Sequence, residues 1–151
     1  MKYAGIDIGS RTIELVIVEA GQLIESRQAD TGYDPIQEAR NLLNGLSYDR
    51  IMATGYGRGL FEISFEDVQT VTEIKAYARG VKELFSDAQT ILDIGGQDSK
   101  AISLFENGKV KKFEMNDRCA AGTGKFLEVM AKALGFSIEK FGEEALKASK
   151  D

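Results

Sequence analysis

Two aspartates stand inside apolar stretches that end in glycine. The first is Asp7, in the stretch YAGIDIGS at residues 3–10, and the second is Asp93, in ILDIGGQD at residues 91–98. An ionised carboxylate in an apolar strand costs free energy unless a cation or hydrogen-bond donors meet it. Such carboxylates suit Mg²⁺, which binds a few of them together with water and substrate phosphates. The pair predicts a magnesium–phosphate site, whereas the alternative is that each aspartate only caps its own glycine turn.

The residues after each aspartate are suited to phosphate. Glycine has no Cβ, so backbone N–H groups at Gly9 and at the Gly95-Gly96 pair can approach phosphate oxygens. The side chains after Gly9 add two hydroxyl groups and one cation, and a carboxamide follows Gly96. If two lobes face each other across a cleft that receives both carboxylates, the phosphates are surrounded by Gly9, Ser10, Arg11, Thr12, Gly95, Gly96 and Gln97.

Each aspartate begins the same series of predicted elements. In the first copy, apolar runs at 3–8, 13–18 and 23–26 predict three strands, with a turn at Ala20-Gly21. In the second copy, runs at 91–94, 101–105 and 110–115 predict three more, with a turn at Asn107-Gly108. The Asn-Gly pair favours a hairpin in which both turn residues have positive φ. The same meander after both copies favours a duplicated architecture over a chance repeat.

Helical periodicity occupies much of the remaining chain. It predicts helices over 35–46, 71–85, 122 or 123 to 134, and 138–148, while a short strand over 50–54 leads into a glycine-rich turn at 55–59. Asp34 is a predicted N-cap with Pro35 at the first helical position, and Thr72 is a second predicted cap. Strands alternating with helices predict an α/β chain. We divide it into lobes at 1–88 and 89–151.

Composition limits the classes of function. The chain has 151 residues, 43% of them hydrophobic, and a formal net charge of −5, which disfavours nucleic acid and anionic membrane partners. It contains no histidine, which excludes imidazole catalysis and imidazole metal sites within it. Without a signal-peptide pattern or an apolar run near the roughly 18 residues of a membrane span, we expect a cytoplasmic protein. The single cysteine, Cys119, is a free thiol, a buried filler or a metal ligand.

Three stretches resemble one family. They are GIDIGSRT at residues 5–12, DIGGQDSK at 93–100 and MNDRCAAGTGKFLEVMA at 115–131, the most specific of the three. The first two resemble the phosphate loops of the actin-like ATPase superfamily. All three together resemble the activator ATPases of 2-hydroxyacyl-CoA dehydratases and the related benzoyl-CoA reductase ATPase subunits, the BadF/BadG/BcrA/BcrD type. The resemblance runs along essentially the whole chain.

The resemblance implies a ribonuclease-H-like fold of two lobes with ATP or ADP between them. In this family, ATP hydrolysis drives a conformational change, and a low-potential electron passes from a [4Fe–4S] cluster at a homodimer interface to the dehydratase or reductase. Asp7, Asp93 and Gln97 are then catalytic, with the two aspartates organising Mg²⁺. Cys119, just before a predicted helix whose dipole favours a thiolate, is then a cluster ligand. Further nucleotide contacts are implied for Gly122, Thr123, Gly124 and Lys125.

Three features depart from the family pattern. Lys125 stands where the family commonly has arginine, which keeps the charge but loses the forked geometry. Tyr77 stands where relatives often have histidine. Only 59 residues run from Asp93 to Asp151, too few for a matching second lobe. The resemblance therefore implies a C-terminally truncated or split form that lacks the adenosine-binding turn and the second cluster cysteine.

Two other functions stay open. One is a small-molecule kinase of the same superfamily, which needs a substrate pocket that these sequences do not obviously supply. The other is a non-catalytic half-domain that assembles with a separate chain. An unfinished second lobe is expected to expose apolar surface and a sheet edge, which favours such association.

Overall fold

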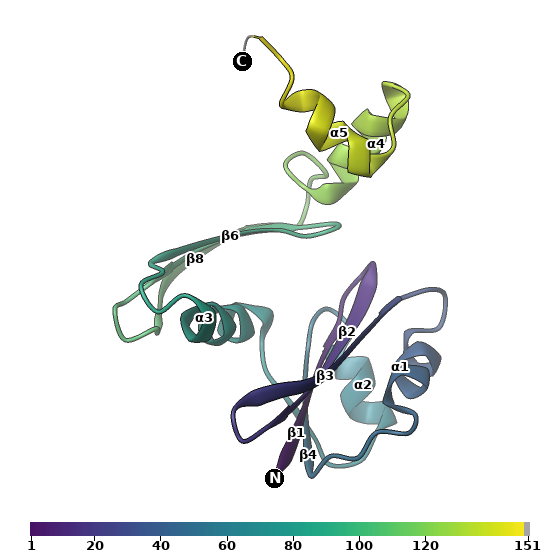
Figure 1. Cartoon of the computed structure of the whole chain (residues 1–151), viewed down its shortest axis with the longest axis vertical. Coiled ribbons are helices and arrows are strands. Elements are labelled where there is room, and N and C mark those ends of the chain that lie inside the picture. Colours follow the sequence, from purple (N-terminus) through teal and green to yellow (C-terminus); the bar gives the residue numbers. More distant parts are fainter. Residues whose placement is uncertain (150–151) are drawn as a thin grey trace. The chain divides into compact units, whose positions relative to one another are not determined.

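The computed structural model describes residues 1–149, which form two compact units that divide between Asp87 and Ala88. Each unit contains a three-stranded antiparallel meander, which agrees with the predicted duplication (Figure 1). The first meander is extended by two further strands, whereas the second meander is followed by two helices.

A five-stranded sheet forms the centre of the first unit. Its strands are β1 (Lys2–Ile8), β2 (Thr12–Glu19), β3 (Gln22–Asp30), β4 (Arg50–Thr54) and β5 (Val68–Thr70), in the order β3-β2-β1-β4-β5. β4 runs parallel to β1 and to β5, and parallel neighbours require crossover connections. The helices α1 (Pro35–Leu43) and α2 (Arg58–Ser64) lie in these connections. The register sets Asp7 opposite Glu14 of β2 and opposite Thr54 of β4.

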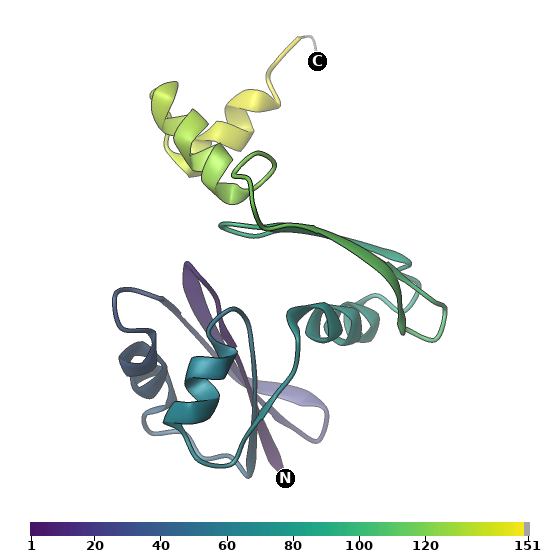
Figure 2. The ribbon, with the colours of Figure 1, turned by 180° about the vertical axis from the view of Figure 1, so that it is seen from behind.

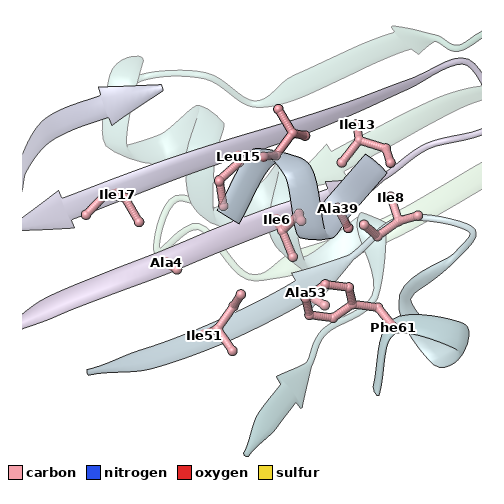
Figure 3. Packing of buried hydrophobic residues seen from close by; sticks show 11 residues of the cluster. Ala4, Ile6, Ile8, Ile13, Leu15, Ile17, Ala39, Ile51, Ala53 and Phe61 are labelled. Carbon is pink, nitrogen blue, oxygen red and sulfur yellow. The ribbon is translucent and has the colours of Figure 1, made fainter. Parts of the chain in front are cut away.

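One face of this sheet carries the hydrophobic core. Alternate residues of β1 and β2 are buried together with Ala39 of α1 and Phe61 of α2 (Figure 3). The buried strand residues are Ala4, Ile6, Ile8, Ile13, Leu15, Ile17, Ile51 and Ala53. Because successive side chains of a strand point to opposite faces, Asp7 and Glu14 lie on the face away from this core. The helix α3 (Glu73–Leu84) is the last element of the unit.

The second unit combines a three-stranded sheet with two helices. The strands β6 (Thr90–Ile94), β7 (Ser99–Leu104) and β8 (Val110–Asn116) pair in the order β6-β7-β8. The helices α4 (Gly124–Ala133) and α5 (Ile138–Ala145) follow and pack against each other (Figure 2). Among the described residues, the buried hydrophobic side chains of this unit are Ile91, Ile102, Leu104 and Ala131. Its core is thus much smaller than that of the first unit.

Most predicted elements are present, with shorter ends. The helix predicted over 35–46 ends at Leu43, the one over 71–85 spans Glu73–Leu84, and the one over 138–148 ends at Ala145. Asp34 caps α1 as predicted, since its carboxylate accepts hydrogen bonds from two backbone N–H groups. Thr72 is at the N-cap of α3 but makes no side-chain hydrogen bond there. None of the helices between residues 1 and 149 has the length and apolar content needed to span a bilayer.

Two regions differ from the prediction. α2 and β5 were not predicted, because α2 has seven residues without a side-chain cap and β5 has three residues. The hairpin predicted at Asn107-Gly108 is confirmed between β7 and β8, but of the two turn residues only Gly108 has positive φ, at 78°. Both values are positive instead in the first hairpin, with 51° at Ala20 and 78° at Gly21. The geometry that a two-residue hairpin favours is therefore found in the first meander.

Candidate functional site

The loop after Asp7 is a tight turn that joins β1 to β2. The N–H of Gly9 donates to the carbonyl of Thr12 at 3.0 Å, and a Cβ on Gly9 would lie 2.7 Å from that same carbonyl oxygen. Thr31 fixes the turn from outside, since its hydroxyl donates to the Gly9 carbonyl at 2.8 Å and its N–H donates to the Arg11 carbonyl at 2.8 Å. The turn therefore requires glycine, and it presents Ser10 and Arg11 as exposed residues.

A second glycine turn packs directly against the end of β1. Gly55 follows β4 with φ of 88°, and a Cβ there would lie 2.2 Å from Asp7 Oδ1 and 2.6 Å from the Ile8 carbonyl oxygen. The N–H of Gly57 donates to the Ile8 carbonyl at 2.9 Å. Only glycine can occupy position 55 without displacing the Asp7 carboxylate. The glycine-rich turn predicted at 55–59 thus positions a predicted catalytic residue.

Asp7 also lines a pocket of about 320 Å³ within the first unit. The other lining residues come from α3 and are Glu73, Ala76, Tyr77, Gly80, Val81 and Leu84. Next to Asp7 across the parallel strand pair, the buried Thr54 Oγ1 has no hydrogen-bond partner among the described residues. A buried hydroxyl in that state requires a partner such as water or an anion. Together, Asp7, Glu73 and the orphaned Thr54 hydroxyl are oxygen donors of the kind that a hydrated Mg²⁺ requires.

The second loop is organised by a buried lysine. Lys100 is 3% exposed, and its ammonium lies 3.2 Å from Asp93 Oδ2 and 2.7 Å from Asp98 Oδ1. Asp93 and Lys100 are cross-strand partners in the β6–β7 register, which places both side chains on one face of the sheet. A Cβ on Gly95 would lie 2.4 Å from Asp98 Oδ1, so the ion pair and the glycine turn are packed together. Gln97, a predicted catalytic residue, is exposed at the tip of this loop.

The N-terminus of α4 is joined to the same loop. The N–H of Gly124 donates to the Gly95 carbonyl at 2.8 Å, and the N–H of Lys125 donates to the Gly96 carbonyl at 2.9 Å. A Cβ on Gly124 would lie 3.0 Å from the Gly95 carbonyl oxygen, so this position favours glycine. Thr123 is fully buried, and its hydroxyl donates to the Ala120 carbonyl at 2.6 Å. The predicted nucleotide contacts at 95–96 and 122–125 are therefore neighbours in the second unit.

Cys119 is exposed in the loop between β8 and α4. Asn116 holds this loop in place: its amide group donates to the carbonyls of Cys119 and Ala121, each at 2.9 Å, and its side-chain oxygen accepts from the Cys119 N–H at 3.2 Å. The thiol is accessible, as a cluster ligand must be, but a [4Fe–4S] cluster ordinarily takes four cysteines. The described residues contain no group of three or more histidine, cysteine or acidic side chains that could hold a metal ion. The chain contains a single cysteine, so its residues alone do not complete such a set.

Sequence reasoning identified the two loops but missed four residues that position them. Thr31 holds the first loop through a hydrogen bond to Gly9, and Thr54 adds a buried hydroxyl beside Asp7. Glu73 adds a second carboxylate to the Asp7 pocket, and Lys100 forms an ion pair with Asp93. The sequence did indicate that Lys100 needs a carboxylate partner. It stands directly before the apolar run of a predicted strand, and a buried lysine requires an opposite charge. The other three depend on contacts between distant segments.

Comparison with known proteins places these loops in a family. The model of the BadF/BadG/BcrA/BcrD ATPase family matches residues 4–151. The activator of lactoyl-CoA dehydratase from Anaerotignum propionicum is 45% identical over 95% of this chain and 58% of the relative. A benzoyl-CoA reductase subunit from Thauera aromatica is 31% identical over 96% of this chain and 55% of its own length.

A solved structure extends the comparison to the fold. The activator of the 2-hydroxyisocaproyl-CoA dehydratase from Clostridium difficile with bound ADPNP has a TM-score of 0.85 and 35% identity, over 100% of this chain and 59% of that chain. The chain thus spans somewhat more than half the length of the relatives it matches. Its α/β fold is that of the actin-like ATPases, and the order β3-β2-β1-β4-β5 is the ribonuclease-H-like arrangement. On these similarities, the chain belongs to the BadF/BadG/BcrA/BcrD ATPase family.

Proposed function

We propose that this chain is part of an ATP-binding and ATP-hydrolysing activator that drives low-potential electron transfer to a partner enzyme. The partner is of the 2-hydroxyacyl-CoA dehydratase or benzoyl-CoA reductase type. The observation that carries the proposal is the similarity, along the whole chain, to a dehydratase activator with bound ADPNP. The names of the other relatives support the same class of partner.

In this proposal Asp7 and Asp93 would together organise Mg²⁺ and the attacking water beside the γ-phosphate, with Asp93 acting through water rather than as a direct metal ligand. Bound Mg²⁺ supplies charge neutralisation for the phosphates and a template for in-line attack. The chain itself contributes the fixed turn at Gly9–Thr12, where Arg11 adds positive charge and Ser10 and Thr12 add hydroxyl donors. Gln97 is suited by its carboxamide and its exposure to orient the water.

The second loop and α4 would hold further phosphate oxygens. Gly95 and Gly96 allow close approach of the backbone, and Gly122, Thr123, Gly124 and Lys125 bring the N-terminal end of α4 to the same place. A helix N-terminus carries partial positive charge that favours anions. The Gly124 and Lys125 N–H groups donate to the loop carbonyls, so they hold α4 against the loop and do not themselves donate to phosphate.

Cys119 is proposed as the residue through which the cluster would be bound. Its exposure and the hydrogen-bonded loop around it support that role. Because one cysteine supplies one of the usual four thiolates, a cluster requires ligands beyond this chain. A homodimer that shares the cluster is the assembly we propose for the whole protein.

Calorimetric titration of the chain with an ATP analogue that is not hydrolysed, in the presence of Mg²⁺, tests nucleotide binding. We expect binding by the unaltered chain and a loss of at least about tenfold in affinity, or roughly 1.4 kcal/mol, for Asp7→Asn. Asp87→Asn, in the exposed connection between α3 and β6, is the matched control and should bind normally. No heat of binding for the unaltered chain would contradict the proposal.

Anaerobic iron and sulfide analysis of the same sample tests the redox part. Stoichiometric iron that disappears in Cys119→Ser would support cluster binding through this residue. Iron that is unaffected by Cys119→Ser would contradict it. The two measurements are independent, so ATP binding and cluster binding can succeed or fail separately.

A further inference from the structure

The most buried charged group in the second unit, among the residues that the structure describes, is the ammonium of Lys100. Its side chain is 4% exposed, whereas those of its two carboxylate partners are 18% exposed for Asp93 and 28% exposed for Asp98. The ammonium lies 3.2 Å from the first carboxylate and 2.7 Å from the second. A buried ammonium is tolerated only when opposite charges and acceptors surround it. Lys100 and the two carboxylates therefore depend on one another. Removal of the ammonium leaves the negative charges uncompensated, and removal of the carboxylates leaves the ammonium uncompensated.

The equivalent place in the first meander has the opposite charge. There, the residue across from Asp7 on the neighbouring strand is Glu14, whereas the residue across from Asp93 is Lys100. Both aspartates are at the same register position, one residue before the end of the first strand of a meander. Glu14 is held by Gln28, whose amide donates to Glu14 Oε1 at 3.0 Å. The first meander thus places two carboxylates where the second places a carboxylate and an ammonium.

We propose that the Lys100 ammonium is a permanent cation that positions the carboxylates of Asp93 and Asp98. In that position it keeps Mg²⁺ from binding directly to Asp93. The external metal then binds on the Asp7 side, where Glu14 across the strand pair and Glu73 in the pocket add negative charge. Lys100 is a positioning residue, because it acts on the phosphate region through Asp93, Asp98 and the loop at Gly95. The proposal deepens the proposed function, on which it rests only for the location of the phosphates.

The physical reason is competition for the same oxygens. Mg²⁺ binds carboxylate oxygens at about 2.1 Å and requires octahedral space around it. An ammonium within hydrogen-bond distance of Asp93 Oδ2 and of Asp98 Oδ1 occupies that space and neutralises the charge that would attract the metal. The ammonium also holds Asp98 Oδ1 against Gly95, which sets the shape of the loop.

Binding of Mn²⁺, used as a paramagnetic substitute for Mg²⁺, tests the proposal without any nucleotide. Free Mn²⁺ is measured by electron paramagnetic resonance on the unaltered chain and on Lys100→Met, which nearly keeps the length of the side chain and removes its charge. We expect Lys100→Met to gain one Mn²⁺ site, at least about tenfold tighter than any at this position in the unaltered chain. The new site should disappear in the double variant Lys100→Met/Asp93→Asn.

Lys112→Met is the matched control. It removes the same charge from an exposed lysine of β8 that pairs with Glu114, and it should gain no site. A gain in Lys112→Met equal to that in Lys100→Met would mean that net charge alone attracts the metal, and the proposal would be wrong. A folded Lys100→Met that gains no site would also overturn it.

Circular dichroism shows whether Lys100→Met folds. If it does not fold, a second variant tests the proposal. Lys100→Gln, which removes the charge but keeps an N–H donor for the two carboxylates, should likewise gain a Mn²⁺ site at least about tenfold tighter than any in the unaltered chain. A folded Lys100→Gln that gains no such site would overturn the proposal. Since no nucleotide is present, a chain that binds no ATP still gives a decisive result.

Discussion

The two meanders start from the same Asp-Ile-Gly sequence and end in different environments. In the first, β1 has a neighbour on each side, and its core face is covered by α1 and α2. In the second, β6 pairs with β7 alone among the described residues, and Leu92 and Ile94 of β6 are 71% and 52% exposed. Glycine is required beside both aspartates, but for different contacts: Gly55 against Asp7 itself, and Gly95 against Asp98.

The difference teaches that a repeated loop can be stabilised in two ways. The first loop is fixed by hydrophobic packing beneath it and by backbone hydrogen bonds from Thr31 and Gly57. The second loop has little buried apolar area beneath it and is fixed by the Lys100 ion pairs and by the N-terminus of α4. Removal of a core side chain should therefore affect the first unit most, and removal of a charge should affect the second unit most.

The largest expected effect is on the core of the first unit. Phe61 is fully buried and stacks on Phe65 with ring centroids 4.1 Å apart. Phe61→Ala should lower the free energy of unfolding by about 3–5 kcal/mol, measured by urea unfolding followed by circular dichroism. The matched variant Phe113→Ala, on β8 and 49% exposed, should cost about 1 kcal/mol or less. Equal losses in the two variants would contradict the difference between the units.

The next effect comes from the contact between Gly55 and Asp7. Gly55→Ala adds a methyl group 2.2 Å from Asp7 Oδ1 at a residue with φ of 88°. We expect a loss of about 2–4 kcal/mol in the free energy of unfolding, from positive φ and from overpacking together. Gly45→Ala is the control, since Gly45 has φ of 77° and open space around its Cβ position, and it should cost about 1–2 kcal/mol. If the free energy of unfolding falls by the same amount in both variants, the close approach of residue 55 to Asp7 contributes nothing to that loss.

A charge reversal would make the first meander resemble the second. Glu14→Lys places an ammonium across from Asp7, as Lys100 lies across from Asp93. Mn²⁺ affinity on the Asp7 side should fall at least about tenfold, or roughly 1.4 kcal/mol, because a cation within a few ångströms repels the metal. Glu62→Lys, with the same charge change on the exposed side of α2, should have little effect. The same electron paramagnetic resonance titration measures both.

The smallest effect concerns the start of α5, an exposed helix of the second unit. The pKa of the Glu139 carboxyl is lowered from its ordinary value, first by its own backbone N–H and then by the Ser137 hydroxyl. Because the pKa is lower in the folded state, the ionised carboxylate stabilises the fold above the unfolded-state pKa, and this contribution is lost as the pH falls through the folded-state pKa. Glu139→Gln should therefore reduce stability slightly near neutral pH and have no effect in strong acid.

Urea unfolding at neutral and at strongly acidic pH measures that difference. Glu143→Gln, on an exposed position of the same helix, is the control. A decrease in the free energy of unfolding of Glu139→Gln that is the same at both pH values would contradict the proposed role of Glu139 ionisation.

Local patterns determined much of this fold. The two meanders, the ends of β1 and β4, the Asp34 cap and the α/β class were all predictable, because apolar alternation, glycine turns and capping residues act within a few positions of the chain. The resemblance of three short stretches was likewise enough to identify the family. The assignments of individual site residues stay predictions.

Tertiary structure alone decided which groups meet. Three of these contacts join segments more than twenty residues apart. They are the contact of Gly55 with Asp7, the hydrogen bond of Thr31 to Gly9 and the position of Thr54 beside Asp7. The short α2 and β5 are stabilised by packing on β4 and β1, since their local signals are weak. The pairing of Lys100 with Asp93 follows from strand register, which is set by the burial of a whole sheet face and so cannot be read from either residue.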